Sequence, residues 1–369
     1  MKKILKMLDG VTDIRQQGKI KHKIKDIITI VFFATIANAN EWTEIQAFAE
    51  MNENFLKKYL ELPNGIPSHD TIQRVMAIVP SVFLQSMQQA WNEMLSVGEG
   101  EKLKKILAID GKTMRGNGNV NQNPLHVVSA VATEHGLCLG QTAVKMKENE
   151  IVAIPVLLRE LNIKNTVVTI DAMGTQTEIA KQIISQKGDY VLALKGNQNS
   201  LYQDVKDYFG DKEFVDGCNY YKTVEKARSQ IEVREYWQTD DISWLSQKAK
   251  WKGLKTIGMT KNTIKRDNVT TVETRYFIGS IGVDAKEFAR CVRGHWKVES
   301  FHWHLDVTFR EDANHTLEKQ GAFNLNIMRK WALVVLKQLE VRKTKTSMKL
   351  KRYYVCANPA KFLEQILLL

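Results

Sequence analysis

The sequence Lys-Ile-Leu-Ala-Ile-Asp at residues 105–110 and the sequence Thr-Val-Val-Thr-Ile-Asp at residues 166–171 decide the predicted fold. Each is an apolar run that ends in an aspartate, and each is typical of a buried strand. A carboxylate at the end of such a strand projects into the crevice where open α/β sheets bind their ligands. The two runs therefore predict a sheet with Asp110 and Asp171 at one edge.

The segments around these runs predict a mixed sheet that helices flank on both faces. The expected elements are a hairpin at 126–133 and 137–144, a strand at 190–195, and helices at 151–161, 175–186 and 201–209. This order indicates an α/β fold of the ribonuclease-H-like kind. In that arrangement the first strand pairs with the hairpin, and the fourth lies parallel beside it.

Other regions of the chain differ from this alternating pattern. Helical periodicity predicts an all-helical N-terminal domain over residues 1–97, joined by a linker at 97–101 to the main domain, 102–340. Short, charge-interrupted runs predict a β-rich insertion at about 218–283. The remaining expected elements are two helices, at 284–319 and 324–339, and a basic tail at 341–369.

The chain is basic, with 53 Lys and Arg against 41 Asp and Glu and a net charge of +12. Such an excess suits a polyanionic partner such as nucleic acid, although a solubilising surface would also explain it. Two clusters favour the nucleic-acid interpretation: Lys19, Lys21, Lys23 and Lys25, and then Arg342, Lys343, Lys345, Lys349, Lys351 and Arg352.

The cysteines and the apolar stretches indicate the cellular compartment of the protein. Four scattered cysteines form no CxxC pair, which suits a reducing cytosol rather than a disulfide framework or a zinc site. The longest apolar stretch, residues 27–39, is too short to cross a bilayer. We therefore expect no membrane partner.

A third carboxylate, Glu299, lies in a dense stretch of His, Trp and acidic residues. At about 100° per residue, the residues on its helix face are His295, His302, Trp303 and Asp306. Two aspartates at strand ends and one helical glutamate can hold two Mg²⁺ ions for phosphoryl transfer. A zinc site at His295, Glu299 and His302 is the alternative, but no HExxH is present and the aspartates favour oxygen-liking ions.

Each of these residues also has a structural interpretation. Asp110 precedes Gly111 and could cap a turn, and Asp171 could serve the turn before a helix that begins near Thr175. Trp296 and Trp303 could stack on an unpaired base, but tryptophans at this spacing more often belong to a core.

Basic and polar residues near the carboxylates are candidates for contacts with DNA. Those after the two predicted strands are Lys112, Arg115, Lys195, Asn197 and Gln198, and those around Glu299 are His295, Lys297, His302 and Arg310. For residues 195–199 a plain strand-to-helix turn is an equal alternative.

Several motifs together resemble those of a known family. They are Gly65–Thr71, Asp110–Lys112, Thr169–Ala172, Leu194–Gln198 and His295–Asp312. Over essentially its whole length the chain resembles the bacterial insertion-sequence transposases of the DDE class, of the H-repeat-associated type (the ISAs-one family).

The resemblance implies a DDE transposase with a ribonuclease-H-like catalytic domain in which Asp110, Asp171 and Glu299 bind metal. It implies strand cleavage and strand transfer with two Mg²⁺ ions, for which Mn²⁺ can substitute. The implied partner is double-stranded DNA, as terminal inverted repeats and target, bound by a homodimer in the bacterial cytoplasm at the nucleoid. The N-terminal domain would contribute to DNA binding.

The chain departs from the family pattern at two places. Residues 226–232 replace a run rich in Gly and His, and residues 314–317 stand where arginines are usual. Two alternatives therefore remain beside the transposase: a DNA-binding relative without catalysis, and a metal-dependent nuclease without strand transfer.

Overall fold

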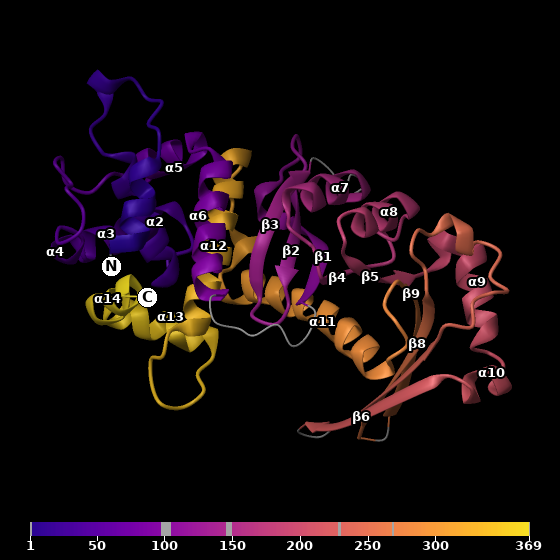
Figure 1. Ribbon diagram of the computed structural model, residues 1–369. Helices are drawn as coiled ribbons and strands as arrows, with labels where there is room; N and C mark the ends of the chain where they lie inside the picture. The colour runs from indigo at the N-terminus through magenta and orange to yellow at the C-terminus, as the bar shows by residue number, and fades with distance from the viewer. Residues whose placement is uncertain (1, 97–104, 145–149, 228–229, 268, 369) are drawn as a thin grey trace.

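The structure is a computed structural model that describes residues 2–96, 105–144, 150–227, 230–267 and 269–368. One long mixed sheet runs through these residues, and a body of helices lies at one end of it (Figure 1). The linker expected at 97–101 lies outside the described residues.

The first five strands have the expected ribonuclease-H-like order. They are β1 (Lys105–Met114), β2 (Leu125–Ala132), β3 (Leu137–Val144), β4 (Thr166–Ile170) and β5 (Asp189–Leu194). Their spatial order is β3-β2-β1-β4-β5, with β1 antiparallel to β2 and parallel to β4. The predicted mixed α/β fold, with the first strand between the hairpin and the fourth strand, is confirmed.

Strand β1 is longer than the sequence indicated. Its pairing with β4 ends at Ile109, but its pairing with β2 continues until Met114 lies opposite Leu125. Asp110 therefore lies inside a strand, at the first position beyond the parallel partner. The expected strand end at Asp110 is wrong, because the β2 ladder continues past it.

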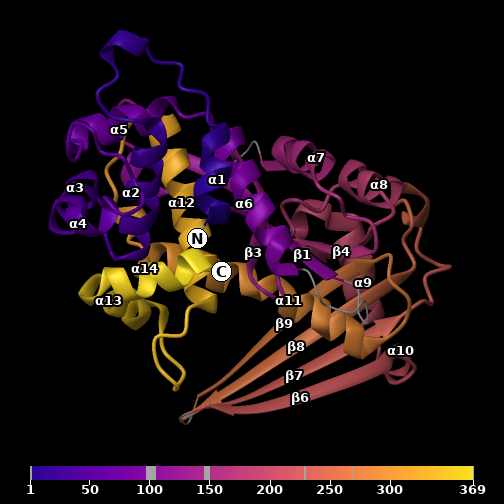
Figure 2. The same ribbon diagram turned by 60° about the vertical axis from the view of Figure 1, so that its left-hand side comes forward.

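The β-rich insertion extends the same sheet. Its strands are β6 (Asn219–Ala227), β7 (Gln230–Thr239), β8 (Thr256–Arg266) and β9 (Val269–Gly279). Strand β9 pairs antiparallel with β5, so all nine strands form one sheet. We call β6–β9 the arm; Figure 2 shows it projecting from the body as a four-stranded ribbon. Its strands are longer than the predicted runs because their outer halves expose both faces, which hides the alternation.

Helices cover both faces of the sheet, as predicted. Those on one face are α7 (Glu150–Glu160), α8 (Thr177–Ser185) and α9 (Asn199–Tyr208), with the short α10 (Lys212–Asp216) after them. The other face is covered by α11 (Ala285–Trp303) and α12 (Lys319–Gln338). A single helix over 284–319 is not formed. A π-helical turn, His304–Thr308, follows α11, and Arg310 then adopts a left-handed conformation with φ 52° that ends the helical path.

The helical body combines both ends of the chain. Its N-terminal helices are α1 (Lys2–Met7), α2 (Ile24–Ile36), α3 (Trp42–Met51), α4 (Glu53–Leu56), α5 (His69–Ile78) and α6 (Ser81–Ser96). Its C-terminal helices are α13 (Met348–Ala357) and α14 (Pro359–Leu368), which lie beside the N-terminal ones (Figure 1). Val355, Phe362 and Leu363 share one apolar core with α2 and α12. The predicted tail is thus two packed helices.

Arg352, which the sequence placed in a basic surface cluster, is fully buried. Its guanidinium donates to the backbone oxygens of Thr308 and Thr35 and to Asn40 Oδ1, and it lies 4.3 Å from the centre of the Phe309 ring. Arg352 therefore joins the C-terminal helices to the N-terminal domain and to the segment after α11.

Among the described helices, none is long and apolar enough to cross a membrane.

We predict that Arg352→Ala lowers the free energy of unfolding by about 3 kcal/mol or more, because it leaves several buried acceptors without a donor. Urea unfolding measures the change. Arg342→Ala, at an exposed position of the same basic cluster, is the matched control and should change stability by less than about 0.5 kcal/mol. Equal stability of the two variants would contradict the structural role of Arg352.

Candidate active site

The pairing register of the two central parallel strands brings Asp110 and Asp171 side by side. Ile109 of β1 is opposite Ile170 of β4, and one aspartate follows each of them. Parallel neighbours lie about 4.8 Å apart in the sheet. Two residues that are 61 positions apart in the chain (171 − 110) therefore begin from adjacent backbone positions.

Both aspartates share the sheet face that α11 covers. Ile106 of β1 and Val167 of β4 pack on α11 in one apolar cluster, and side chains alternate along each strand. Gly294 permits this close packing, since a Cβ there would lie 3.1 Å from the Ile106 side chain. The side chain of Asp284 begins the helix by accepting from the backbone N–H groups of Lys286 and Glu287.

His295, on α11, faces β4. Its Nδ1 is 3.2 Å from Thr169 Oγ1 on β4. Burial lowers the pKa of His295, while the negative charges of Asp110 and Asp171 act in the opposite direction. The negative charges of both aspartates thus act on the His295 imidazole.

Glu299 follows one helical turn later and interacts with Asp110. Partial burial raises the pKa of Glu299, and the charge of Asp110 raises it further. One more turn along, His302 Nδ1 lies 3.3 Å from Asp110 Oδ2. Burial raises the pKa of Asp110, but the hydrogen bond and the charge of His302 outweigh this effect and lower it.

Asp171 stabilises the turn that follows β4. Its Oδ1 accepts hydrogen bonds from the backbone N–H groups of Met173 at 3.0 Å and of Gly174 at 3.1 Å. One carboxylate oxygen of Asp171 thus serves the turn before the next helix, as the sequence suggested. Both roles are compatible, because a carboxylate has a second oxygen and further lone pairs.

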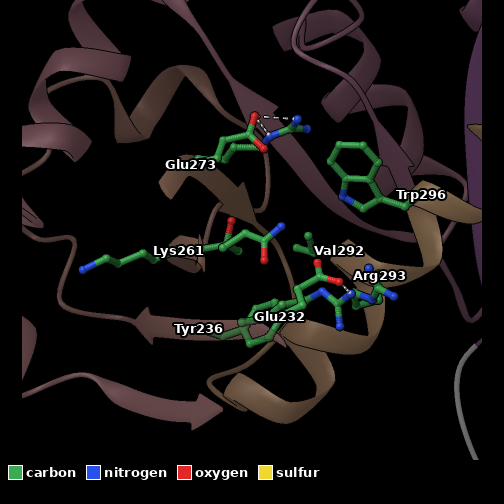
Figure 3. A pocket seen from close by; sticks show the side chains of 11 residues that line it. Glu232, Tyr236, Lys261, Glu273, Val292, Arg293 and Trp296 are labelled. Carbon is green, nitrogen blue, oxygen red and sulfur yellow. Dashed lines mark hydrogen bonds and ion pairs between the residues drawn. The ribbon is translucent and has the colours of Figure 1, made fainter. Parts of the chain in front are cut away.

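A hollow of about 360 Å³ opens beside these residues. Its lining includes Asp171, Glu299, His295 and Lys195, together with residues of the arm. A second hollow of about 160 Å³ continues along α11 and shares Glu273, Arg275, Val292 and Trp296 with the first. We call the second hollow the arm groove. In Figure 3, Glu273 and Trp296 lie on one side of the arm groove, and Glu232 and Arg293 lie on the other.

Arg275 at the junction of the two hollows was not predicted from the sequence. Its guanidinium lies 4.2 Å from the centre of the Trp296 ring and bonds to Glu273 at 2.7–2.9 Å. The alternation along β9 places Arg275 on the α11 face. Its position beside the site depends on the pairing of β9 with β5, for which the sequence carries no signal.

The remaining predicted DNA contacts divide into three groups. Lys195 lines the hollow, and Lys297 and Arg310 are exposed. Asn197 donates to the Ala172 carbonyl and Gln198 to the Thr175 carbonyl, so both residues join the turn after β5 to the turn after β4. The third group, Lys112 and Arg115, faces carboxylates: Lys112 is buried among three of them, and Arg115 lies 3.8 Å from Asp312.

The three carboxylates have the oxygen ligands that a Mg²⁺ site would need. Asp110 and Asp171 follow paired residues of β1 and β4, and Glu299 lies on α11, which covers that face of the sheet. In the described part of the chain, no group of three or more His, Cys, Asp or Glu side chains already has the arrangement of a metal site. A bound ion would therefore require side-chain adjustments, including at the Asp110 oxygen that His302 contacts.

Comparison with known proteins gives two family matches. Residues 5–92 match the "DDE_Tnp_1-associated" family, and residues 101–335 match the "Transposase DDE domain" family. The chain is 38% identical to "Putative transposase YncI" of Escherichia coli O157:H7, over 99% of this chain and 94% of that protein. It is 36% identical to "H repeat-associated putative transposase YhhI" of Escherichia coli K12, over 85% and 84%.

Among solved structures, a piggyBac transposase synaptic complex with hairpin DNA is similar, with a TM-score of 0.44 and 10% sequence identity. The match covers 98% of this chain and 79% of that one. The two family matches together span most of the described sheet and the helical body. The chain belongs to the DDE transposase family, and within that family it is similar to the H-repeat-associated proteins.

Proposed function

We propose that this protein cleaves DNA strands and joins them to target DNA by Mg²⁺-dependent phosphoryl transfer. Asp110, Asp171 and Glu299 would hold the ions, with Mn²⁺ as a substitute. The observation that supports the proposal is the register of β1 and β4, which makes Asp110 and Asp171 neighbours on the sheet face that α11, the helix of Glu299, covers. The family membership supports it.

The chemistry has two steps of the same kind. Water would attack a phosphodiester at the transposon end, break its P–O3′ bond, and leave a 5′-phosphate and a free 3′-hydroxyl. That hydroxyl would then attack a target phosphodiester in line and displace the 3′-hydroxyl of the target strand. Mg²⁺ ions would lower the pKa of the attacking oxygen and stabilise the leaving one. Asp110 is suited to bind them because one of its carboxylate oxygens, Oδ2, faces His302 and the other remains for an ion.

The arm groove is the proposed path of the DNA backbone next to this site. It joins the hollow at Arg275 and carries Arg293 on an exposed turn of α11. Arginine side chains in a groove of this kind position phosphates without reading sequence. The arm and the body would thus hold the DNA while the carboxylates act on one phosphodiester.

Residues 314–317, where the family usually has arginines, have another role here. Asn314 donates to the Asn40 carbonyl and to Glu41, and Thr316 Oγ1 accepts from Trp42 Nε1. These residues pack the segment after α11 on the N-terminal domain. Because these positions hold no arginines for contacts with DNA, a DNA-binding relative without catalysis is the second candidate. The following assay separates this candidate from an active transposase.

We predict that Asp171→Asn reduces Mg²⁺-dependent cleavage and joining of terminal-repeat DNA about a thousandfold or more, since losing one metal ligand removes several kcal/mol of transition-state stabilisation. An asparagine can still accept the hydrogen bonds of Met173 and Gly174, so the turn and the fold should survive. Gel analysis of labelled DNA gives cleavage and joining separately.

Asp216→Asn, at an exposed position on α10, is the matched control and should retain activity. Full activity of Asp171→Asn would refute the proposed metal site. Metal-dependent cleavage without any joined product would indicate a nuclease, and salt-sensitive DNA binding without cleavage by the parent chain would indicate the non-catalytic relative.

For the arm groove, we predict that Arg293→Ala weakens binding of DNA regardless of its sequence. The slope of log K against log salt should fall by about 0.9, as expected for the loss of one phosphate contact. Fluorescence anisotropy at several salt concentrations measures it. Arg159→Ala, on the far face of the sheet in α7, is the control; the same slope for both variants would exclude the groove as the DNA path.

A further inference from the structure

Lys112, two residues after Asp110 on β1, is buried among acidic side chains. Only 9% of the residue is exposed. Its Nζ lies 2.6 Å from Asp306 Oδ1, 3.1 Å from Glu311 Oε2 and 2.9 Å from Asp312 Oδ1. An ammonium group carries three N–H donors, so a DNA phosphate would have to displace one of these carboxylates. We call these four residues the Lys112 cluster.

The three carboxylates of the Lys112 cluster belong to the segment that continues α11. Asp306 lies in the π-helical turn, seven residues after Glu299 (306 − 299), and Glu311 and Asp312 lie in the short turn that follows. Lys112 lies on the strand of Asp110 and, two positions later, on the same sheet face. The ammonium therefore connects the strand of one proposed metal ligand to the helix of another.

The backbone around the Lys112 cluster is shaped to bring these groups together. Arg310 adopts a left-handed conformation, with φ 52°, which is unfavourable for a residue with a side chain and directs Glu311 back toward β1. Gly116 permits the contact from the other side. A Cβ at Gly116 would lie 2.6 Å from the carbonyl oxygens of Asp312 and Asn314.

The Lys112 cluster places three carboxylates around one ammonium group. Burial raises the pKa of Glu311, but the charges of Lys112 and Arg329 outweigh that effect and lower it. Without the ammonium, Glu311, which is 0% exposed, would lose its nearest cation and repel Asp306 and Asp312.

We propose that Lys112 is a positioning residue, which fixes the separation of Asp110 and Glu299 by holding the segment after α11 against β1. The effect of Lys112 on Mg²⁺ binding rests on the proposed function, since it requires that Asp110 and Glu299 bind the metal and that their separation sets its affinity. It gives Lys112 a role different from a phosphate contact. The contact of His302 with Asp110 is a second connection between the same two elements.

The test compares Lys112→Met with Lys112→Arg, which keeps the charge, and with Lys164→Met, an exposed lysine before β4, as the control. Mg²⁺ binding is measured by calorimetry and by the concentration for half-maximal cleavage. We expect Lys112→Met to weaken Mg²⁺ binding about tenfold, as for other residues that orient metal ligands, and Lys112→Arg to restore much of it.

DNA affinity without metal separates positioning from phosphate contact. Positioning predicts a change below about twofold and an unaltered salt dependence, whereas a phosphate contact would lower the salt slope by about 0.9. A lower salt slope with unchanged Mg²⁺ affinity would overturn the proposal. If Lys112→Met does not fold, Asp306→Asn decides by the same measurements, because it removes one negative charge from the Lys112 cluster at a side chain that is 34% exposed.

Hydrogen exchange without metal or DNA tests the positioning role separately from the proposed function. Backbone amides of residues 299–309 should exchange faster in Lys112→Met than in Lys164→Met, with β4 and β5 unchanged. If the parent chain neither binds Mg²⁺ nor cleaves DNA, the proposed function fails while this measurement still applies. Equal exchange in both variants would overturn the role of Lys112.

Discussion

The parallel pairing of β1 with β4 is the constraint on which the rest of the site depends. With Ile109 opposite Ile170, the two following aspartates are adjacent and face the same side of the sheet. A shift of one residue would turn one aspartate toward α7 and α8 on the other face. Close packing opposes such a shift, because Ile106 and Val167 pack against α11 while Leu107 and Val168 pack in the core on the other face.

Helix α11 completes the site because it is held at several points along its length. Gly294 lets it approach β1, His295 contacts Thr169, and His302 contacts Asp110. Beyond the helix, the Lys112 cluster joins the segment that follows to the same strand. Glu299 lies between these points, so its position is determined by contacts on both sides rather than by its own side chain, which is exposed.

Basic residues serve two purposes in this protein, and charge alone does not separate them. Arg329, Lys330 and Arg352 are buried and join the helical body to the sheet and to the segment after α11. Arg293, Lys297 and Lys195 are exposed along α11 and the hollow. Only the second group is available to phosphates. The interior group explains why a net charge of +12 overstates the surface that could meet DNA.

The sequence by itself determined the order of the elements around Asp110 and Asp171, because apolar runs of β-type residues and helical periodicity are local properties. It also indicated Glu299, whose helical neighbours share its face. Only the tertiary structure decided that the arm joins the sheet through β9, that Arg275 borders the site, and that Arg352 and Lys112 are buried. These features depend on contacts between residues far apart in the chain. A lysine or arginine has the same local pattern whether its partner is water, a phosphate or a buried carboxylate.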